Sequence, residues 1–144
     1  EEQTDEAKDV SKENTLAFSI TAQNEVMLND KPVAVADIRR RIVDFVRMRG
    51  AQHLILVDAN PASDYNTYFT LENEIVAAYA AVRNAEAKRR YHRDYASCTD
   101  EQRKKVRDIY PQHLSETYNT AEVNNSSEDN KTSKAVDEKK GGAE

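Results

Sequence analysis

Residues 64–91, DYNTYFTLENEIVAAYAAVRNAEAKRRY, carry the longest regular pattern in the chain. Large apolar side chains recur there at spacings of three and four, which places them on one face of an α-helix. These side chains are Tyr68, Leu71, Ile75, Ala78, Tyr79 and Val82. Ser63 or Asp64 can serve as the N-cap, and the closing AKRRY places cations where the helix dipole favours them. Because such a helix must bury its apolar face, we expect it to pack on a sheet.

The residues before this helix predict three strands and a further helix. Residues 14–20 and 25–28 read as the two strands of a hairpin, and turn residues follow at 29–32. Residues 53–59, HLILVDA, contain four consecutive large aliphatic residues, which is typical of a central strand covered on one face or on both. Between the turn residues and this strand, a second set of apolar side chains falls on one face of a helix. Gly50 follows this helix, and a left-handed C-cap is expected there. That face consists of Val35, Ile38, Ile42, Phe45 and Val46.

The residues after the long helix predict a short helix and a last strand. Thr99 opens a capping box with Gln102, and Pro111 closes the short helix. Residues 112–118 can form the strand. The predicted order is β-β-α-β-α-α-β. This order favours an α+β fold, with a small mixed sheet of about four strands and two main helices packed on one face.

Charge and composition divide the chain into three parts. Residues 1–13 carry a net charge of −4 and residues 121–144 a net charge of −2, and both are poor in large apolar side chains. We therefore expect both ends to be disordered. Residues 14–120 carry a net charge of +1 and have the size of one domain. The longest uncharged apolar run, residues 75–82, is far shorter than the roughly 20 residues of a membrane span.

The sequence offers little that predicts catalysis or metal binding. Gly50 is the one glycine of residues 14–120, which excludes the glycine-rich phosphate loops. His53, His92 and His113 show no metal-ligand spacing and are expected at the surface or at a strand edge. A metal site assembled across the fold is the alternative. We predict no bound metal and no cofactor.

The remaining reactive groups have simple structural interpretations. Cys98 could form a nucleophilic couple with His92 or His113, but it lacks a flanking signature and is interpreted as an incidental loop thiol. Asp58 and Asp64 could act in acid–base catalysis. A position at the end of a strand explains Asp58 equally well, and a role as helix cap explains Asp64. We therefore predict no catalytic residue and no enzymatic activity.

A basic segment spans residues 83–107, with nine basic and four acidic side chains, and with Tyr91 and Tyr95 between them. Such a segment could bind nucleic acid or another anionic surface. The domain as a whole carries only +1, however, and non-specific nucleic-acid binding usually needs a broader basic footprint. A solvated helical face is the favoured interpretation, and no nucleic-acid partner is expected.

The ordered set of elements resembles the periplasmic domain of the ExbD/TolR biopolymer-transport proteins. The resemblance rests on LNDKPV at 28–33, the helix after it, HLILVDA followed by NPASDY, and the long helix. It looks closest to ExbD of the Bacteroidota type, which has segments similar to NEIVAAY at 73–79, DEQRKKVRDIYP at 100–111 and QHLSE at 112–116. It covers roughly residues 14–118. The acidic tail that follows is not required by the family pattern.

The resemblance implies a single-pass inner-membrane protein. Residues 1–13 would be a linker, and the spanning helix with its proton-responsive aspartate would precede them. The domain would be the periplasmic part of a TonB–ExbB–ExbD complex, in which the proton-motive force drives outer-membrane transport. It would act with an ExbB-like channel subunit and a TonB-like protein. The alternatives are a TolR-like protein that binds peptidoglycan and, more distantly, a nucleic-acid-binding α/β module.

The expected mode of action is binding through a sheet edge. A small sheet with a hairpin at one end and a late strand at the other leaves edges that can accept another backbone. We predict a homodimer and a bound partner segment. The candidate partner-binding residues are Leu16, Ala17 and Phe18 in the first strand and Leu114, Ser115 and Glu116 in the last.

Overall fold

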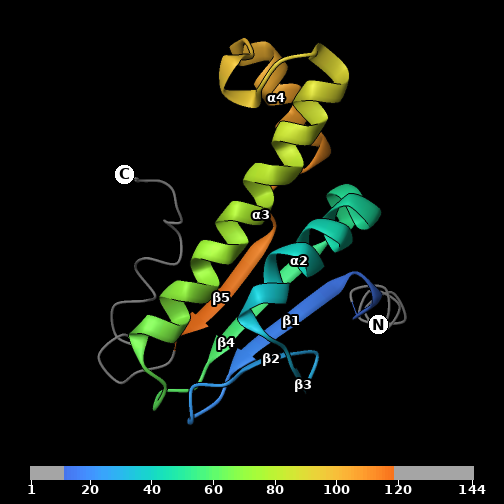
Figure 1. The fold of residues 1–144 in the computed structure, drawn as a ribbon. Coiled ribbons are helices and arrows are strands. Elements are labelled where there is room, and N and C mark those ends of the chain that lie inside the picture. The colour runs from blue at the N-terminus through green and yellow to red at the C-terminus, as the bar shows by residue number, and fades with distance from the viewer. Residues whose placement is uncertain (1–11, 119–144) are drawn as a thin grey trace.

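The computed structural model describes residues 12–118 (Figure 1). The elements in chain order are β1 (Thr15–Ile20), β2 (Val26–Leu28), β3 (Lys31–Pro32), α2 (Val35–Arg49), the 3-10 turn η1 (Gly50–Gln52), β4 (Leu54–Ala59), α3 (Tyr65–Tyr91), the 3-10 turn η2 (Tyr95–Ser97), α4 (Asp100–Ile109) and β5 (Leu114–Tyr118). Nearly all of the predicted linker and the whole predicted tail lie outside the described residues. Within residues 12–118, no helix combines the length and the apolar character that crossing a bilayer requires.

The strands form one mixed sheet in the order β3-β2-β1-β4-β5. β1 pairs with β2 in the antiparallel sense, while β4 runs parallel to both β1 and β5. The predicted α+β class is confirmed. The sheet has one strand more than expected because the residues predicted as a turn include the two-residue strand β3. Asn29 and Asp30 form the tight connection to β3, with φ of 50° and 69°, values that Asn and Asp tolerate better than most residues.

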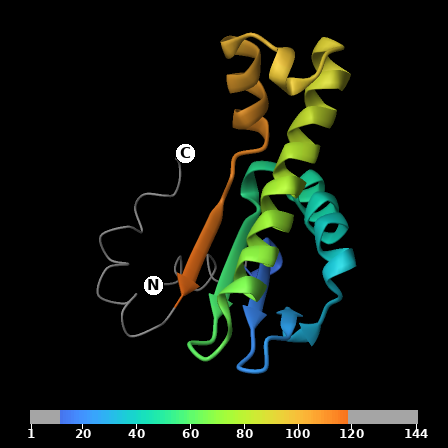
Figure 2. The same cartoon turned by 60° about the vertical axis from the view of Figure 1, so that its left-hand side comes forward.

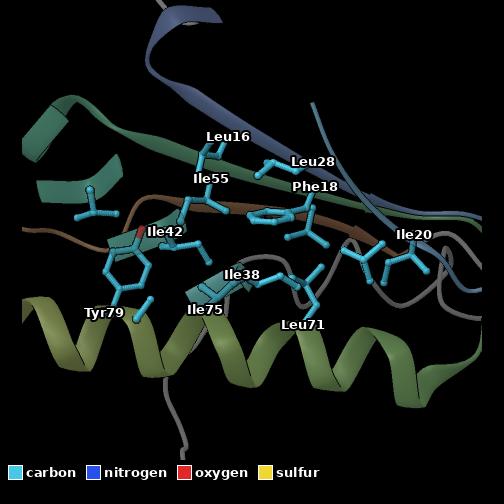
Figure 3. Packing of buried hydrophobic residues seen from close by; sticks show 14 of the residues in the cluster. Leu16, Phe18, Ile20, Leu28, Ile38, Ile42, Ile55, Leu71, Ile75 and Tyr79 are labelled. Carbon is cyan, nitrogen blue, oxygen red and sulfur yellow. The ribbon is translucent and has the colours of Figure 1, made fainter. Parts of the chain in front are cut away.

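The helices α2 and α3 cover one face of the sheet (Figures 1 and 2). Buried residues alternate along β1 and β4, so one face of each strand supplies the core. Figure 3 shows Phe18 and Ile55 of the sheet facing Ile38 and Ile75 of the helices. The predicted apolar face of α3 is confirmed, with Tyr68 only partly buried at its start.

The face predicted for the first helix is correct in its centre and wrong at one end. Ile38, Ile42 and Val46 are fully buried, and Phe45 is partly buried against the core. Val35 is 44% exposed because it is the first residue of α2, at the end of the helix.

The predicted helix ends are confirmed by their local contacts. The Asp64 side chain accepts a hydrogen bond from the Thr67 N–H at 2.9 Å, which makes Asp64 the N-cap of α3. Thr99 and Gln102 form the expected capping box at the start of α4. Gly50 has φ of 60° and terminates α2, where the absence of a Cβ makes this backbone accessible.

The last third of α3 extends beyond the sheet and packs with η2 and α4 as a separate arm (Figure 2). Its small core contains Ala87, Cys98 and Val106, with Tyr91 and Tyr95 packed around them. The chain then returns from this arm to the sheet as β5, which places that strand at the edge beside β4.

Candidate functional site

Three of the six predicted partner-binding residues lie in the centre of the sheet. Leu16, Ala17 and Phe18 belong to β1, which has β2 on one side and β4 on the other. The backbone of Ala17 is already satisfied by Asn29, whose side chain accepts the Ala17 N–H at 3.0 Å and whose N–H donates to the Ala17 carbonyl at 2.8 Å. The prediction that β1 is an edge strand with an unpaired side is therefore wrong. The chain crosses over through α2 and places β4 beside β1, so that β1 becomes an inner strand.

The other three predicted residues lie at the edge of the sheet. Leu114, Ser115 and Glu116 belong to β5, the last strand in the sheet order, and no strand of residues 12–118 pairs with its outer side. Their edge position is confirmed, and their role in partner binding stays a prediction.

The register of β5 determines which backbone groups point outward. The Ile55 N–H donates to the His113 carbonyl at 2.9 Å, and Ile55 lies opposite Leu114. In a parallel pair, alternate residues direct both backbone groups to the same neighbour. Ser115 therefore bonds toward β4, whereas Leu114 and Glu116 direct their N–H and C=O groups away from it.

The same register assigns the side chains of β5 to the two faces of the sheet. Leu114 lies opposite Ile55 and Glu116 opposite Val57, and both partners in β4 are buried beneath the helices. Leu114 and Glu116 thus lie on the helix-covered face, where Leu114 packs against the core. Ser115 lies on the opposite face.

A buried polar cluster holds the start of β5. His53 is 1% exposed, with Nδ1 2.7 Å from the Gly50 carbonyl oxygen and Nε2 hydrogen-bonded to the Tyr79 hydroxyl. Because a carbonyl only accepts, Nδ1 carries the proton and Nε2 accepts from Tyr79. The backbone of His113 also hydrogen-bonds to the Tyr79 hydroxyl, and His113 Nδ1 donates to the His53 carbonyl at 3.2 Å. The expectation that His53 lies at the surface or a strand edge is wrong, since these hydrogen bonds satisfy it inside the fold.

The electrostatics of this cluster favour neutral His53 and protonated Tyr79. Burial lowers the pKa of His53, the Gly50 hydrogen bond opposes that shift, and nearby His113 and Arg83 lower the pKa further. Burial also raises the pKa of the Tyr79 hydroxyl, which remains a donor. Arg83 donates from Nε to the Tyr110 carbonyl at 3.0 Å, just before β5. These bonds join η1, β4 and α3 to the beginning of the edge strand.

The lowered pKa of His53 predicts a stability change in mildly acidic solution. The unfolded chain takes up a proton near the ordinary histidine value of 6.5, while folded His53 resists protonation until its own lower pKa. The free energy of unfolding should therefore fall as the pH drops through 6.5, down to the pKa of the folded state. Urea unfolding between pH 8 and pH 5 measures this slope. His92→Gln should retain the slope and His53→Gln should reduce it, and an equal slope in both variants would contradict the prediction.

Just over half of the basic side chains of the segment pair with nearby carboxylates. Within residues 12–118, five of its nine basic side chains form ion pairs, which are Lys88–Asp94, Arg89–Glu86, Arg90–Glu86, Arg103–Asp100 and Lys104–Asp108. Hydrogen bonds from Arg89 and then Arg90 lower the pKa of buried Glu86. This pairing supports the interpretation of the segment as a solvated helical face.

The remaining candidate groups have local structural roles. Cys98 is buried in the small core of the arm, where its Sγ lies 3.4 Å from the Asp94 carbonyl oxygen, so it is a packed thiol rather than an open loop thiol. His92 is the left-handed C-cap of α3. Asp58 is exposed near the end of β4. In the described part of the chain, no three His, Cys, Asp or Glu side chains are grouped as a metal site.

The His53–Tyr79 hydrogen bond is the main feature that the sequence analysis missed. The two residues are 26 positions apart, and Tyr79 was interpreted only as part of an apolar face. One signal was present, because a buried tyrosine hydroxyl usually needs a hydrogen-bond partner. The identity of that partner depends on how α3 lies across β4.

Comparison with models of known protein families gives no match for this chain. No curated protein matches it significantly either.

Proposed function

We propose that this chain is the periplasmic part of an ExbD-like subunit of a TonB–ExbB–ExbD complex. Its membrane-spanning helix would precede Glu1 and would contact an ExbB-like channel subunit in the inner membrane. The described domain would have a binding role rather than an enzymatic one. It would form a homodimer and bind a segment of a TonB-like protein, so that the proton-motive force drives outer-membrane transport.

The observation that carries this proposal is the edge strand β5. The outward backbone groups of Leu114 are directed to where a further strand would lie. Main-chain hydrogen bonds supply affinity when a peptide extends a sheet in this way. The polar cluster at His53 and Tyr79 supports the proposal, because a strand that is already held in place loses less entropy on binding.

The resemblance of the sequence to the ExbD/TolR family supports the same proposal. The order of the larger elements is the one expected from that resemblance, with α4 lying between the long helix and the last strand. Nucleic-acid binding is less well supported, because acidic neighbours pair with five of the nine basic side chains of the segment.

Titration of the isotope-labelled chain with a peptide from the periplasmic segment of a TonB-like protein tests the proposal. Amide resonances of β5 and of its neighbour β4 should shift. Leu114→Pro should bind about tenfold more weakly than Leu114→Ala, because proline removes the outward N–H and adds a bulky ring. Both variants lose the packing of the Leu114 side chain against the core, and Leu114→Ala keeps the N–H, so it is the matched control.

Three outcomes would contradict the proposal. Shifts that occur only with peptidoglycan fragments would favour a TolR-like role. Binding to nucleic acid with a steep salt dependence would favour the more distant alternative. Equal effects of Leu114→Pro and Leu114→Ala would show that the outward N–H of β5 does not bind the segment.

A further inference from the structure

The polar cluster of His53, Tyr79 and His113 forms a connected set of hydrogen bonds around the start of β5. The Tyr79 hydroxyl donates to His53 Nε2 and accepts the backbone N–H of His113. His113 Nδ1 in turn donates to the His53 carbonyl at 3.2 Å, and the two imidazole rings stack with their centroids 5.4 Å apart. Two of these bonds hold the residue just before β5, and the third requires an unprotonated His53 Nε2.

This arrangement accommodates only the neutral form of His53. Its Nδ1 already donates to the Gly50 carbonyl, so a second proton must go to Nε2. The Nε2–H and the Tyr79 O–H would then point at each other, and the hydroxyl proton would have to turn away from its acceptor. Because the Tyr79 oxygen also accepts from His113, a change at His53 reaches the start of β5 directly.

The groups that face His53 make a positive charge on its ring unfavourable. Helix α3 contributes the Tyr79 hydroxyl and the Arg83 guanidinium, and the chain before β5 contributes the stacked ring of His113. The turn η1 contributes the Gly50 carbonyl. Burial lowers the pKa of His53, and the nearby His113 and Arg83 lower it further, although the hydrogen bond to Gly50 opposes the shift.

The start of β5 is the part of this cluster that can separate most easily. Strand β5 lies at the edge of the sheet, where β4 is its one strand neighbour within residues 12–118 (Figure 2). His113 is exposed, whereas His53 and Tyr79 are buried in the core. Local opening costs least where a segment has few buried contacts. Separation at His113 would let water solvate a charged His53 while β1 and α3 stay in place.

We infer that protonation of His53 releases the start of β5 from β4 and α3, so that the edge strand is closed at neutral pH and open in mild acid. Release breaks the two bonds of His113 within the cluster and the bond from the Ile55 N–H to the His113 carbonyl. Strands β1, β2 and β4 stay paired in the open form. Only one consequence rests on the proposed function, which is that acid also weakens the binding of a partner segment at β5.

Proton linkage gives the expected size and direction of this effect. In the open form His53 is solvated and takes up a proton near its ordinary pKa of 6.5, whereas the closed form resists protonation. The opening equilibrium constant should therefore rise as the pH falls below 6.5, by up to about tenfold per pH unit. The rise ends where the pH reaches the lower pKa of His53 in the closed form.

Native-state hydrogen exchange of the full chain tests the inference. The amides of His113 and Ser115 should lose about tenfold in protection between pH 7.5 and pH 5.5, after correction for the intrinsic exchange rate at each pH. Low concentrations of urea should leave this loss unchanged, because local opening exposes little surface. The Phe18 amide of the inner strand β1 should stay more protected, and its exchange should accelerate with urea.

Single histidine variants identify the group that responds to pH. His53→Gln keeps a hydrogen-bonding side chain that is neutral at every pH, and it should remove the pH dependence at Ser115. His92→Gln is the matched control, because His92 lies at the C-cap of α3, outside the polar cluster, and it should retain the full tenfold change. His113→Gln should retain most of the change at Ser115, because His53 is still present.

The inference is overturned by any of three results. A pH dependence at Ser115 that survives in His53→Gln, or disappears only in His113→Gln, assigns the response to another group. Equal losses at Phe18 and Ser115 with the same urea dependence show global unfolding instead of release of β5. Constant protection of Ser115 down to pH 5.5 shows that His53 does not open the strand.

Two features of the design keep these results decisive. The comparison of Ser115 with Phe18 uses the parent chain, so it tests the inference even if His53→Gln does not fold. The exchange experiments contain no partner peptide, whereas the titration with a TonB-like segment is carried out at neutral pH. A failure of the pH response therefore leaves the proposed function standing, and a failure of peptide binding leaves the pH response standing.

Discussion

Phe18→Ala is expected to lower the free energy of unfolding by about 3–5 kcal/mol, the usual cost of removing a buried phenylalanine from a packed core. Phe18 is 1% exposed in the central strand β1, opposite Leu28 of β2 and Val57 of β4. Its ring lies between the sheet and the two helices (Figure 3). Removing the ring leaves a cavity that strands paired on both sides cannot close. Urea unfolding monitored by circular dichroism measures the loss.

Phe69→Ala provides a control with the same chemical change. Phe69 is half exposed on α3 and contributes little to the core. Alanine also has the higher helix propensity, so we expect a change within about 1 kcal/mol. Similar losses for the two variants would contradict the assignment of β1 to the centre of the core. They would also argue against the conclusion that Leu16, Ala17 and Phe18 lie in an inner strand and do not bind a partner.

Tyr79→Phe is expected to lower the free energy of unfolding by about 1–3 kcal/mol, although it removes only one oxygen. The variant leaves His53 Nε2 inside the fold without its donor and removes the acceptor that the His113 backbone contacts. The loss should concentrate at the start of β5. Hydrogen exchange of amides 113–116 should therefore accelerate more than exchange in β1, and unfolding experiments give the overall change.

Tyr91→Phe is the matched control for this prediction. Tyr91 packs against the small core of the arm, and its hydroxyl forms no hydrogen bond within residues 12–118. This variant should unfold within about 0.5 kcal/mol of the parent chain. The role given to the polar cluster fails if both variants are equally stable, or if Tyr79→Phe leaves exchange in β5 unchanged.

These effects connect stability to the proposed binding role. An edge strand receives hydrogen bonds from one neighbour only, so β5 depends on contacts at its start more than β1 or β4 does. The His53–Tyr79–His113 cluster supplies those contacts from α3 and β4. A variant that weakens the cluster should therefore also weaken partner binding, because part of the binding energy must then order the strand.

Local features of this protein are readable from neighbouring residues. The period of apolar side chains identified the helices, and Asp64, Thr99 and Gly50 identified where helices begin or end. The two-residue strand β3 escaped prediction, because Lys31 and Pro32 lack an apolar alternation and join the sheet only through the tight turn before them.

The sequence by itself determined the helices, most strands, their buried faces and the α+β class, since each depends on residues within a few positions of one another. Tertiary structure alone decided which strand is the edge, and it thereby removed Leu16, Ala17 and Phe18 from the candidate site while keeping Leu114, Ser115 and Glu116. It also joined His53 to Tyr79 and brought α3 beside β5. The physical reason is that strand order and side-chain contacts across the core depend on crossovers between distant segments. A local sequence pattern does not specify those crossovers.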